Sequence, residues 1–181
     1  MDTVRGQLLI AGPSLLDPNF WRTVVLIVEH SAEGALGLVL NRPSQATVAE
    51  TVPALHDLLD GDQQVFLGGP VGPSSVIVLA RFEDPGAAAL LAFGDVGVLG
   101  GDVSLHQPPA GIREGRAFVG HAGWGPGQLD EELGRGDWIL EPARQEDAFA
   151  ADPQRLWSAV LTRKGGSYAL LARMPADPSV N

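Results

Sequence analysis

The sequence contains no cysteine, which excludes disulfide bonds, a thiolate nucleophile and any metal site or cluster held by cysteine. Long hydrophobic runs are also missing. The longest, residues 23–28 and 76–80, fall far short of the ~20 apolar residues that cross a bilayer. Residues 1–6 carry charges and precede only a short apolar run, so we expect no secretory signal. These absences predict a soluble, cytoplasmic protein that does not enter a membrane.

Positive charge is scarce as well. The chain has 12 lysines and arginines against 22 aspartates and glutamates, a formal net charge of −10, and Lys164 is its single lysine. An acidic protein repels a nucleic-acid backbone, and no run of basic residues offsets this repulsion locally. We therefore expect no direct contact with nucleic acid.

Apolar residues are plentiful enough for a core. The chain has 181 residues, 45% of them hydrophobic, which suits one domain spanning residues 1–181 without a disulfide staple. No repeat, long linker or charge run marks an internal boundary. Strand-like and helix-like segments occur along the whole chain, so the sequence predicts a single α+β domain.

Two neighbouring segments give the clearest strand prediction. Residues 23–28 are apolar and β-branched without alternation, the pattern of a strand buried on both faces. Residues 31–34 form a turn, and residues 37–41 return as the second strand of a hairpin. A turn is expected at residues 68–73. Further strands are expected at residues 65–67, 76–80, 96–99, 103–105, 116–120, 138–140 and 168–173.

The first helix is predicted from its cap. Thr47 and Glu50 have capping-box spacing, which predicts a helix to about Leu59, with a late start or a kink at Pro53. Further helices are expected at residues 86–92, 128–133 and 153–164. The last of these carries an apolar face formed by Leu156, Trp157, Val160 and Leu161, and Gly165 ends it.

Several blocks together resemble the bacterial YqgE/AlgH family. They are residues 17–20, 22–27, 29–30, 34–43, 68–71, 123–132 and 177–181, in the family's order and over nearly the whole chain. The resemblance implies a barrel-like, branched and mostly antiparallel sheet surrounded by helices, in a cytoplasmic protein without an established activity. It also carries an association with transcriptional regulation. Because the chain shows neither a basic face nor a helix-turn-helix pattern, such a role is expected to be indirect.

One candidate binding segment is the glycine-rich stretch before the helix at residues 128–133. Gly123, Trp124, Gly125 and Gln128 are its candidate contacts with a ligand or partner, and Trp124 is expected to be partly exposed. The glycine spacing matches no phosphate-binding fingerprint. A tight turn whose acids complement the helix dipole is the favoured interpretation. The other three tryptophans are expected in the core.

The second candidate surface consists of four polar residues that bracket the predicted hairpin. These are Asn19, Arg22, Asn41 and Arg42, which the strand ends are expected to bring together. Arginine suits carboxylate or phosphate groups because its planar fork matches their geometry. The alternative, and favoured, role is hydrogen bonding to loop backbone.

No catalytic motif is present. There is no G-x-S-x-G elbow and no H-E-x-x-H spacing, and Asp130, Glu131 and Glu132 diverge around a helix, so we predict neither metal nor cofactor. Glu29 and His30 point to opposite faces of a strand. The sequence favours a non-enzymatic binding or regulatory protein that acts through a protein partner or small ligand. The alternatives are an enzyme whose site lies at the four hairpin residues, and an indirect transcription-linked regulator.

Overall fold

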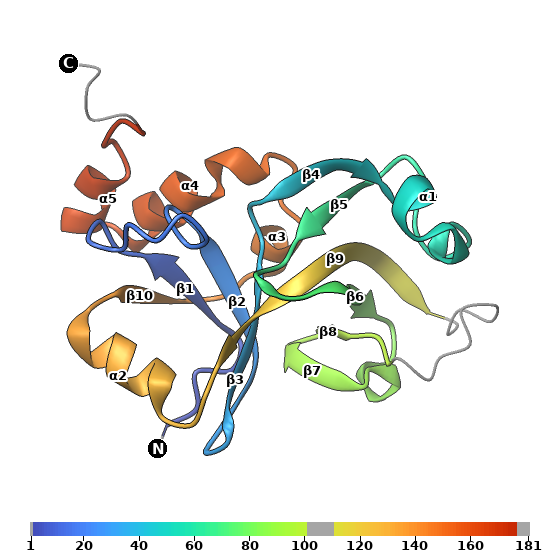
Figure 1. Ribbon diagram of the computed structural model, residues 1–181, viewed down its shortest axis with the longest axis horizontal. Coiled ribbons are helices and arrows are strands. Elements are labelled where there is room, and N and C mark those ends of the chain that lie inside the picture. The colour runs from blue at the N-terminus through green and yellow to red at the C-terminus, as the bar shows by residue number, and fades with distance from the viewer. Residues whose placement is uncertain (1, 101–110, 177–181) are drawn as a thin grey trace.

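The computed structural model describes residues 2–100 and 111–176, and Figure 1 shows a bent sheet with helices around it. The strands are β1 (Gln7–Ala11), β2 (Val24–Ser31), β3 (Gly34–Val39), β4 (Pro43–Thr47), β5 (Gln64–Leu67), β6 (Val71–Phe82), β7 (Leu90–Phe93), β8 (Val96–Val98), β9 (Ile112–Trp124) and β10 (Trp138–Pro142). The helices are α1 (Val48–Thr51), α2 (Gln128–Arg135), α3 (Gln145–Ala148), α4 (Leu156–Lys164) and α5 (Ser167–Leu171). Short 3₁₀ turns are η1 (Pro53–Leu55), η2 (Pro85–Ala87) and η3 (Pro153–Arg155).

The strands form one branched sheet in the order β10-β1-β2-β3-β9-β6-β8-β7. The long strand β9 is the branch point, because it pairs with β3 near its end, with β6 along most of its length, and with β5. The β5–β9 pair is parallel and the other described pairs are antiparallel. The α+β fold and the branched, mostly antiparallel sheet are thus confirmed. Within the described residues the sheet is not a closed barrel, since its path ends at β10 and β7.

Strand β2 lies at the centre of the core. Its residues 24–28 are fully buried, as predicted from their unbroken apolar run. The even-numbered side chains pack in one cluster with Trp157 of α4. The odd-numbered side chains pack in a second cluster with Trp124 and Trp138. The strand therefore joins two halves of the core.

The hairpin β2–β3 is confirmed, with its turn between Ser31 and Gly34. A bulge after Ile27 precedes the polar end of β2. There Glu29 is exposed, whereas the His30 side chain is only 2% exposed and its Nδ1 accepts a hydrogen bond from the Val4 N–H at 3.2 Å. The two side chains lie on opposite faces, so they do not form an acid–base pair.

Helix predictions near caps are confirmed, but the lengths are not. The Thr47–Glu50 capping box is present, yet α1 ends at Thr51 instead of continuing to Leu59. Pro53 begins the 3₁₀ turn η1, because proline cannot continue the hydrogen-bonding pattern of the preceding turn. The predicted apolar face of α4 is buried and Gly165 ends that helix.

Four other predictions need correction or lie outside the described residues. Residues 86–92 are not a helix: η2 is followed by the strand β7. Residues 168–173 are not a strand, because Gly165 and Gly166 at φ of 80° and 58° turn the chain so that α5 packs against α4. The predicted turn at 68–73 is shorter, since β6 begins at Val71. The strand expected at 103–105 lies outside the described residues.

Candidate functional site

The structure brings three of the four hairpin residues to one pocket. Asn41 follows β3 and clamps the chain before β2: its Oδ1 accepts from the Val24 N–H at 3.0 Å and its Nδ2 donates to the Arg22 carbonyl at 2.9 Å. Arg42 donates through Nη2 to the Trp21 carbonyl at 2.8 Å. These contacts hold the loop before β2 in place, as the favoured interpretation predicted.

Arg22 is held more elaborately than its neighbours. It has a positive φ of 53°, and its Nη2 donates to the carbonyls of Met174 at 2.5 Å and Pro175 at 2.8 Å. Its guanidinium lies over the Trp157 ring, 4.4 Å from the centroid, and 5.3 Å from that of Trp21. Burial lowers the pKa of Arg22 from its ordinary value. The guanidinium is therefore fixed in position by aromatic and backbone contacts.

Three adjoining hollows surround these arginines, and together we call them the arginine groove. The largest has a volume of about 620 Å³ and is lined by Leu16, Pro18, Trp21, Arg22, Asn41, Arg42 and Gln154. A hollow of about 150 Å³ shares Leu16, Trp21 and Arg22 with it. A hollow of about 210 Å³ shares Arg42 and contains Asn19, the fourth predicted residue.

The groove combines exposed apolar side chains with the two arginines. Leu16 is 73% exposed, Trp21 38% and Leu67, at the far end, 51%. Among residues 2–100 and 111–176, no aspartate or glutamate lines any of the three hollows. Among the described residues, neither Arg22 nor Arg42 has a carboxylate within 4.0 Å. The ion pairs in this part of the chain are formed by other arginines, by histidines and by Lys164.

The glycine-rich segment forms a different arrangement, in which Trp124 is buried rather than partly exposed. Only 6% of Trp124 is accessible, and its ring packs edge-on against Trp138 at 6.2 Å between centroids. Its Nε1 donates to Glu132 Oε2 at 2.9 Å, and the Nε1 of Trp138 donates to the same oxygen at 2.8 Å. Trp124 is unavailable as an interface residue without opening the core.

The remaining candidates of this segment complete a closed network. The Gly125 N–H donates to Gln128 Oε1 at 3.0 Å, and Gln128 Nε2 donates to Glu132 Oε1 at 3.0 Å. Gly127 begins α2 with a φ of 73°, a conformation that glycine adopts without strain. Gly123 is exposed on β9. These contacts support the tight-turn interpretation of the segment.

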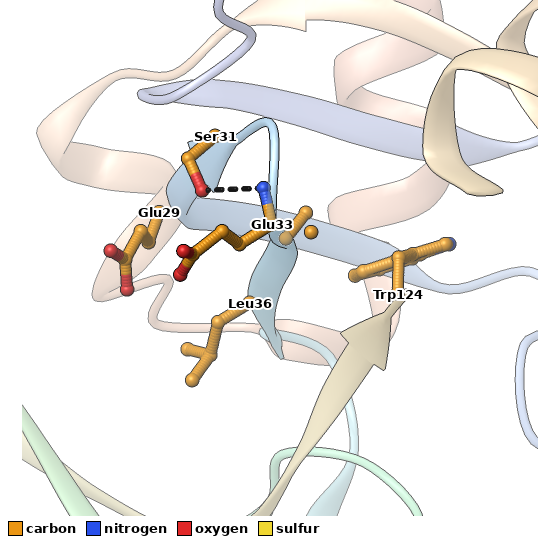
Figure 2. Close-up of a pocket in the computed structure, with 7 residues that line it drawn as sticks. Glu29, Ser31, Glu33, Leu36 and Trp124 are labelled. Carbon is orange, nitrogen blue, oxygen red and sulfur yellow. Dashed lines mark hydrogen bonds between the residues drawn. The ribbon is translucent and has the colours of Figure 1, made fainter. Parts of the chain in front are cut away.

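A further pocket of about 210 Å³ lies at the tip of the β2–β3 hairpin, where Trp124 forms one wall. Figure 2 shows Glu29 and Glu33 extending to one side of the hairpin, away from Trp124. Ser31 Oγ accepts from the Glu33 N–H at 3.2 Å and so shapes the turn. Within the described residues, no group of three or more His, Cys, Asp or Glu side chains is arranged to hold a metal ion.

Two residues of the site were missed by sequence reasoning. Trp21 was expected in the core, but it lies exposed beside Arg22. Its position in a turn-rich loop next to a charged residue was the available signal. Glu132 was considered as a partner of the helix dipole and, less favourably, as a metal ligand, whereas its half-buried carboxylate accepts from the two tryptophans that flank α2.

The sequence and structure both have relatives among known proteins. A model of the AlgH-like family matches residues 8–169. The chain belongs to the AlgH-like family. A UPF0301 protein of Streptomyces avermitilis is 40% identical over 189 residues, covering 100% of this chain and 97% of that one. A UPF0301 protein of Thermobifida fusca is 38% identical and covers 99% and 96%.

Solved structures agree with this AlgH-like fold. A crystal structure of a Corynebacterium diphtheriae protein superimposes with a TM-score of 0.84 at 26% identity, covering 96% of this chain and 94% of that one. The solution structure of the AlgH protein from Pseudomonas aeruginosa gives a TM-score of 0.71 at 30% identity and covers 98% of both chains. No helix in the described part of the AlgH-like chain is long and apolar enough to cross a membrane.

Proposed function

We propose that this AlgH-like protein is a non-enzymatic binding protein that captures an acidic, partly apolar segment of a protein partner in the arginine groove. The observation that carries this proposal is the pair of guanidiniums, Arg22 and Arg42, without a carboxylate partner among the described residues of a chain with 22 acids. The absence of cysteine suits a reducing compartment, so we place the protein in the cytoplasm. Any transcription-linked role would run through the captured partner.

The composition of the groove supports protein recognition. Arginine and tryptophan are the residue types that carry much of the binding energy at interfaces. Trp21 and Leu16 offer exposed apolar surface at the centre of the largest hollow. Because Arg22 is already held by Trp157 and backbone carbonyls, binding a carboxylate there costs little side-chain entropy.

The residue types that line the groove favour binding over catalysis. Within the part of the chain that the structure describes, the residues that line the three hollows include no acid, histidine, lysine, serine or tyrosine, so they supply no general base and no nucleophile. Both Oδ1 and Nδ2 of the Asn41 side chain are already hydrogen-bonded to backbone groups. The enzyme alternative at the four hairpin residues therefore has less support than the binding role.

The test uses a random library of short peptides selected on the immobilised protein. We expect the recovered peptides to be enriched in aspartate or glutamate next to leucine or aromatic residues. Trp21→Ala and Arg42→Gln should each weaken a selected peptide by about thirtyfold, the effect of losing an interface hot spot. Tyr168→Ala and Arg113→Gln are matched controls, because both residues are exposed and lie outside the groove.

Two outcomes would rule out the groove as the binding surface. If acidic peptides are not enriched, or if folded Trp21→Ala and Arg42→Gln proteins bind a selected peptide as tightly as the wild type, the groove is not the binding surface. Circular dichroism of each variant verifies that weaker binding does not reflect unfolding.

A further inference from the structure

Arg116, in the middle of β9, is half-buried and, like Arg22 and Arg42, has no carboxylate within 4.0 Å among the described residues. Its Nη2 donates to the Ala150 carbonyl at 3.2 Å. The guanidinium lies over the Phe66 ring, 4.4 Å from the centroid. Its Nη1 is shielded from solvent and has no hydrogen-bond partner among the described residues. Part of the hydrogen-bonding capacity of this half-buried cation is therefore unused among the described residues.

The surrounding charges do not neutralise it. Burial lowers the pKa of Arg116, and the negative charge of Glu114, two residues along β9, opposes that shift only in part. Glu114 is itself 4.0 Å from Arg81. The contrast within the chain is Arg163, whose pKa is raised by its hydrogen bonds to the buried Asp147. A partly buried guanidinium without a carboxylate partner among the described residues is less favourable than a paired one, and an anion supplied from outside would supply the missing charge.

A small cavity is lined by this guanidinium and by residues of β5 and of the chain after α3. Strand β5 runs parallel to β9, and Figure 1 shows these two strands near α3. The cavity has a volume of about 130 Å³, and it is lined by Gln63, Gln64, Phe66, Arg116, Ala150, Ala151 and Pro153. None of these described lining residues is acidic. Since a water occupies about 30 Å³ in the liquid, the space suits one oxyanion group with a water or two rather than a whole nucleotide.

The two glutamines of the cavity differ in availability. Gln64 Nε2 donates to the Ser44 carbonyl at 3.0 Å and so holds β5 against β4. Gln63 precedes β5, and its side-chain amide makes no hydrogen bond within the part of the chain that the structure describes. An amide N–H₂ donor at the mouth and a guanidinium at the wall are the groups that recognise phosphate or carboxylate oxygens.

We propose that this cavity binds the phosphate or carboxylate group of a small ligand, with Arg116 as its counter-charge and Gln63 as a donor at its mouth. The site is separate from the arginine groove and does not depend on the function proposed there. Phe66 lies against the guanidinium and lines the same cavity, so the ring helps to hold the charge beside it.

The test titrates the wild-type protein with inorganic phosphate and, separately, with acetate, at ionic strength held constant with sodium chloride. In amide NMR spectra we expect saturable shifts confined to the signals around Gln63, Gln64, Ala150 and Ala151. At a hundredfold excess over the dissociation constant, the bound anion should raise Tm by about 5–10 °C. Saturation by phosphate alone assigns a phosphate ligand, and saturation by acetate assigns a carboxylate ligand.

Two arginine variants show whether the effect belongs to this site. Arg116→Met keeps an apolar side chain over Phe66 and should abolish the anion-dependent rise in Tm. Arg113→Met, on the same strand but exposed, should respond like the wild type. If Arg116→Met does not fold, the localised wild-type titration decides the matter alone. The proposal is overturned if neither anion causes saturable shifts at these amides, or if Arg116→Met responds as the wild type does.

Discussion

Replacing Glu132 with alanine should destabilise the protein severely, although Glu132 lies on a helix facing partly into solvent. Its Oε2 accepts the indole N–H groups of Trp124 and Trp138, at 2.9 and 2.8 Å. Both rings are buried, 6% and 5% exposed, so alanine leaves two buried donors unpaired. Each unpaired buried donor costs about 1–3 kcal/mol, which gives a loss of about 2–6 kcal/mol in the free energy of unfolding.

Urea unfolding followed by tryptophan fluorescence and circular dichroism measures this loss, with an unchanged slope required for a two-state comparison. Glu131→Ala is the matched control, because Glu131 is the exposed neighbour on the same helix and should change the free energy by less than about 0.5 kcal/mol. A Glu132→Ala protein as stable as the control would refute the view that this carboxylate locks the glycine-rich segment to the core. Binding of selected peptides should be unaffected in either variant that remains folded.

Two further predictions concern charges outside the candidate sites. Asp147 is 3% exposed and accepts two hydrogen bonds from Arg163 on α4, so Asp147→Ala should lower the free energy of unfolding in urea by about 3–5 kcal/mol. Asp152 forms only an exposed ion pair, so Asp152→Ala should lower it by less than about 1 kcal/mol, and equal losses in the two variants would contradict this. For Asp95, burial tends to raise the pKa, but hydrogen bonds and charge from Arg81 outweigh it and hold the pKa below the ordinary 3.8. Its stabilising contribution is present above pH 3.8 and is lost as the pH falls through the lower folded-state pKa. Asp95→Asn should therefore lose less stability than the wild type over that acidic range, and parallel curves of unfolding free energy against pH would disprove the assignment.

Much of the fold was readable from local pattern. The uninterrupted apolar run of β2 predicted burial on both faces, and the Thr47–Glu50 spacing predicted a helix cap, because both features depend on side chains a few residues apart. The apolar face of α4 and its end at Gly165 followed in the same way. The four polar residues around the hairpin were also identifiable, since they flank the most recognisable strands.

The tertiary structure alone decided which candidates are accessible. Trp21 and Trp124 both stand next to turn residues, yet Trp21 lies exposed in the groove and Trp124 is enclosed by Phe20, Trp138 and Glu132. Local sequence specifies the period and the turns of a segment, but burial depends on which distant segments pack against it. The surroundings of Arg116, which has no carboxylate within 4.0 Å among the described residues, were equally invisible in the sequence. Strands β9 and β5 and the chain after α3 meet only in the folded protein, and their meeting partly buries the guanidinium.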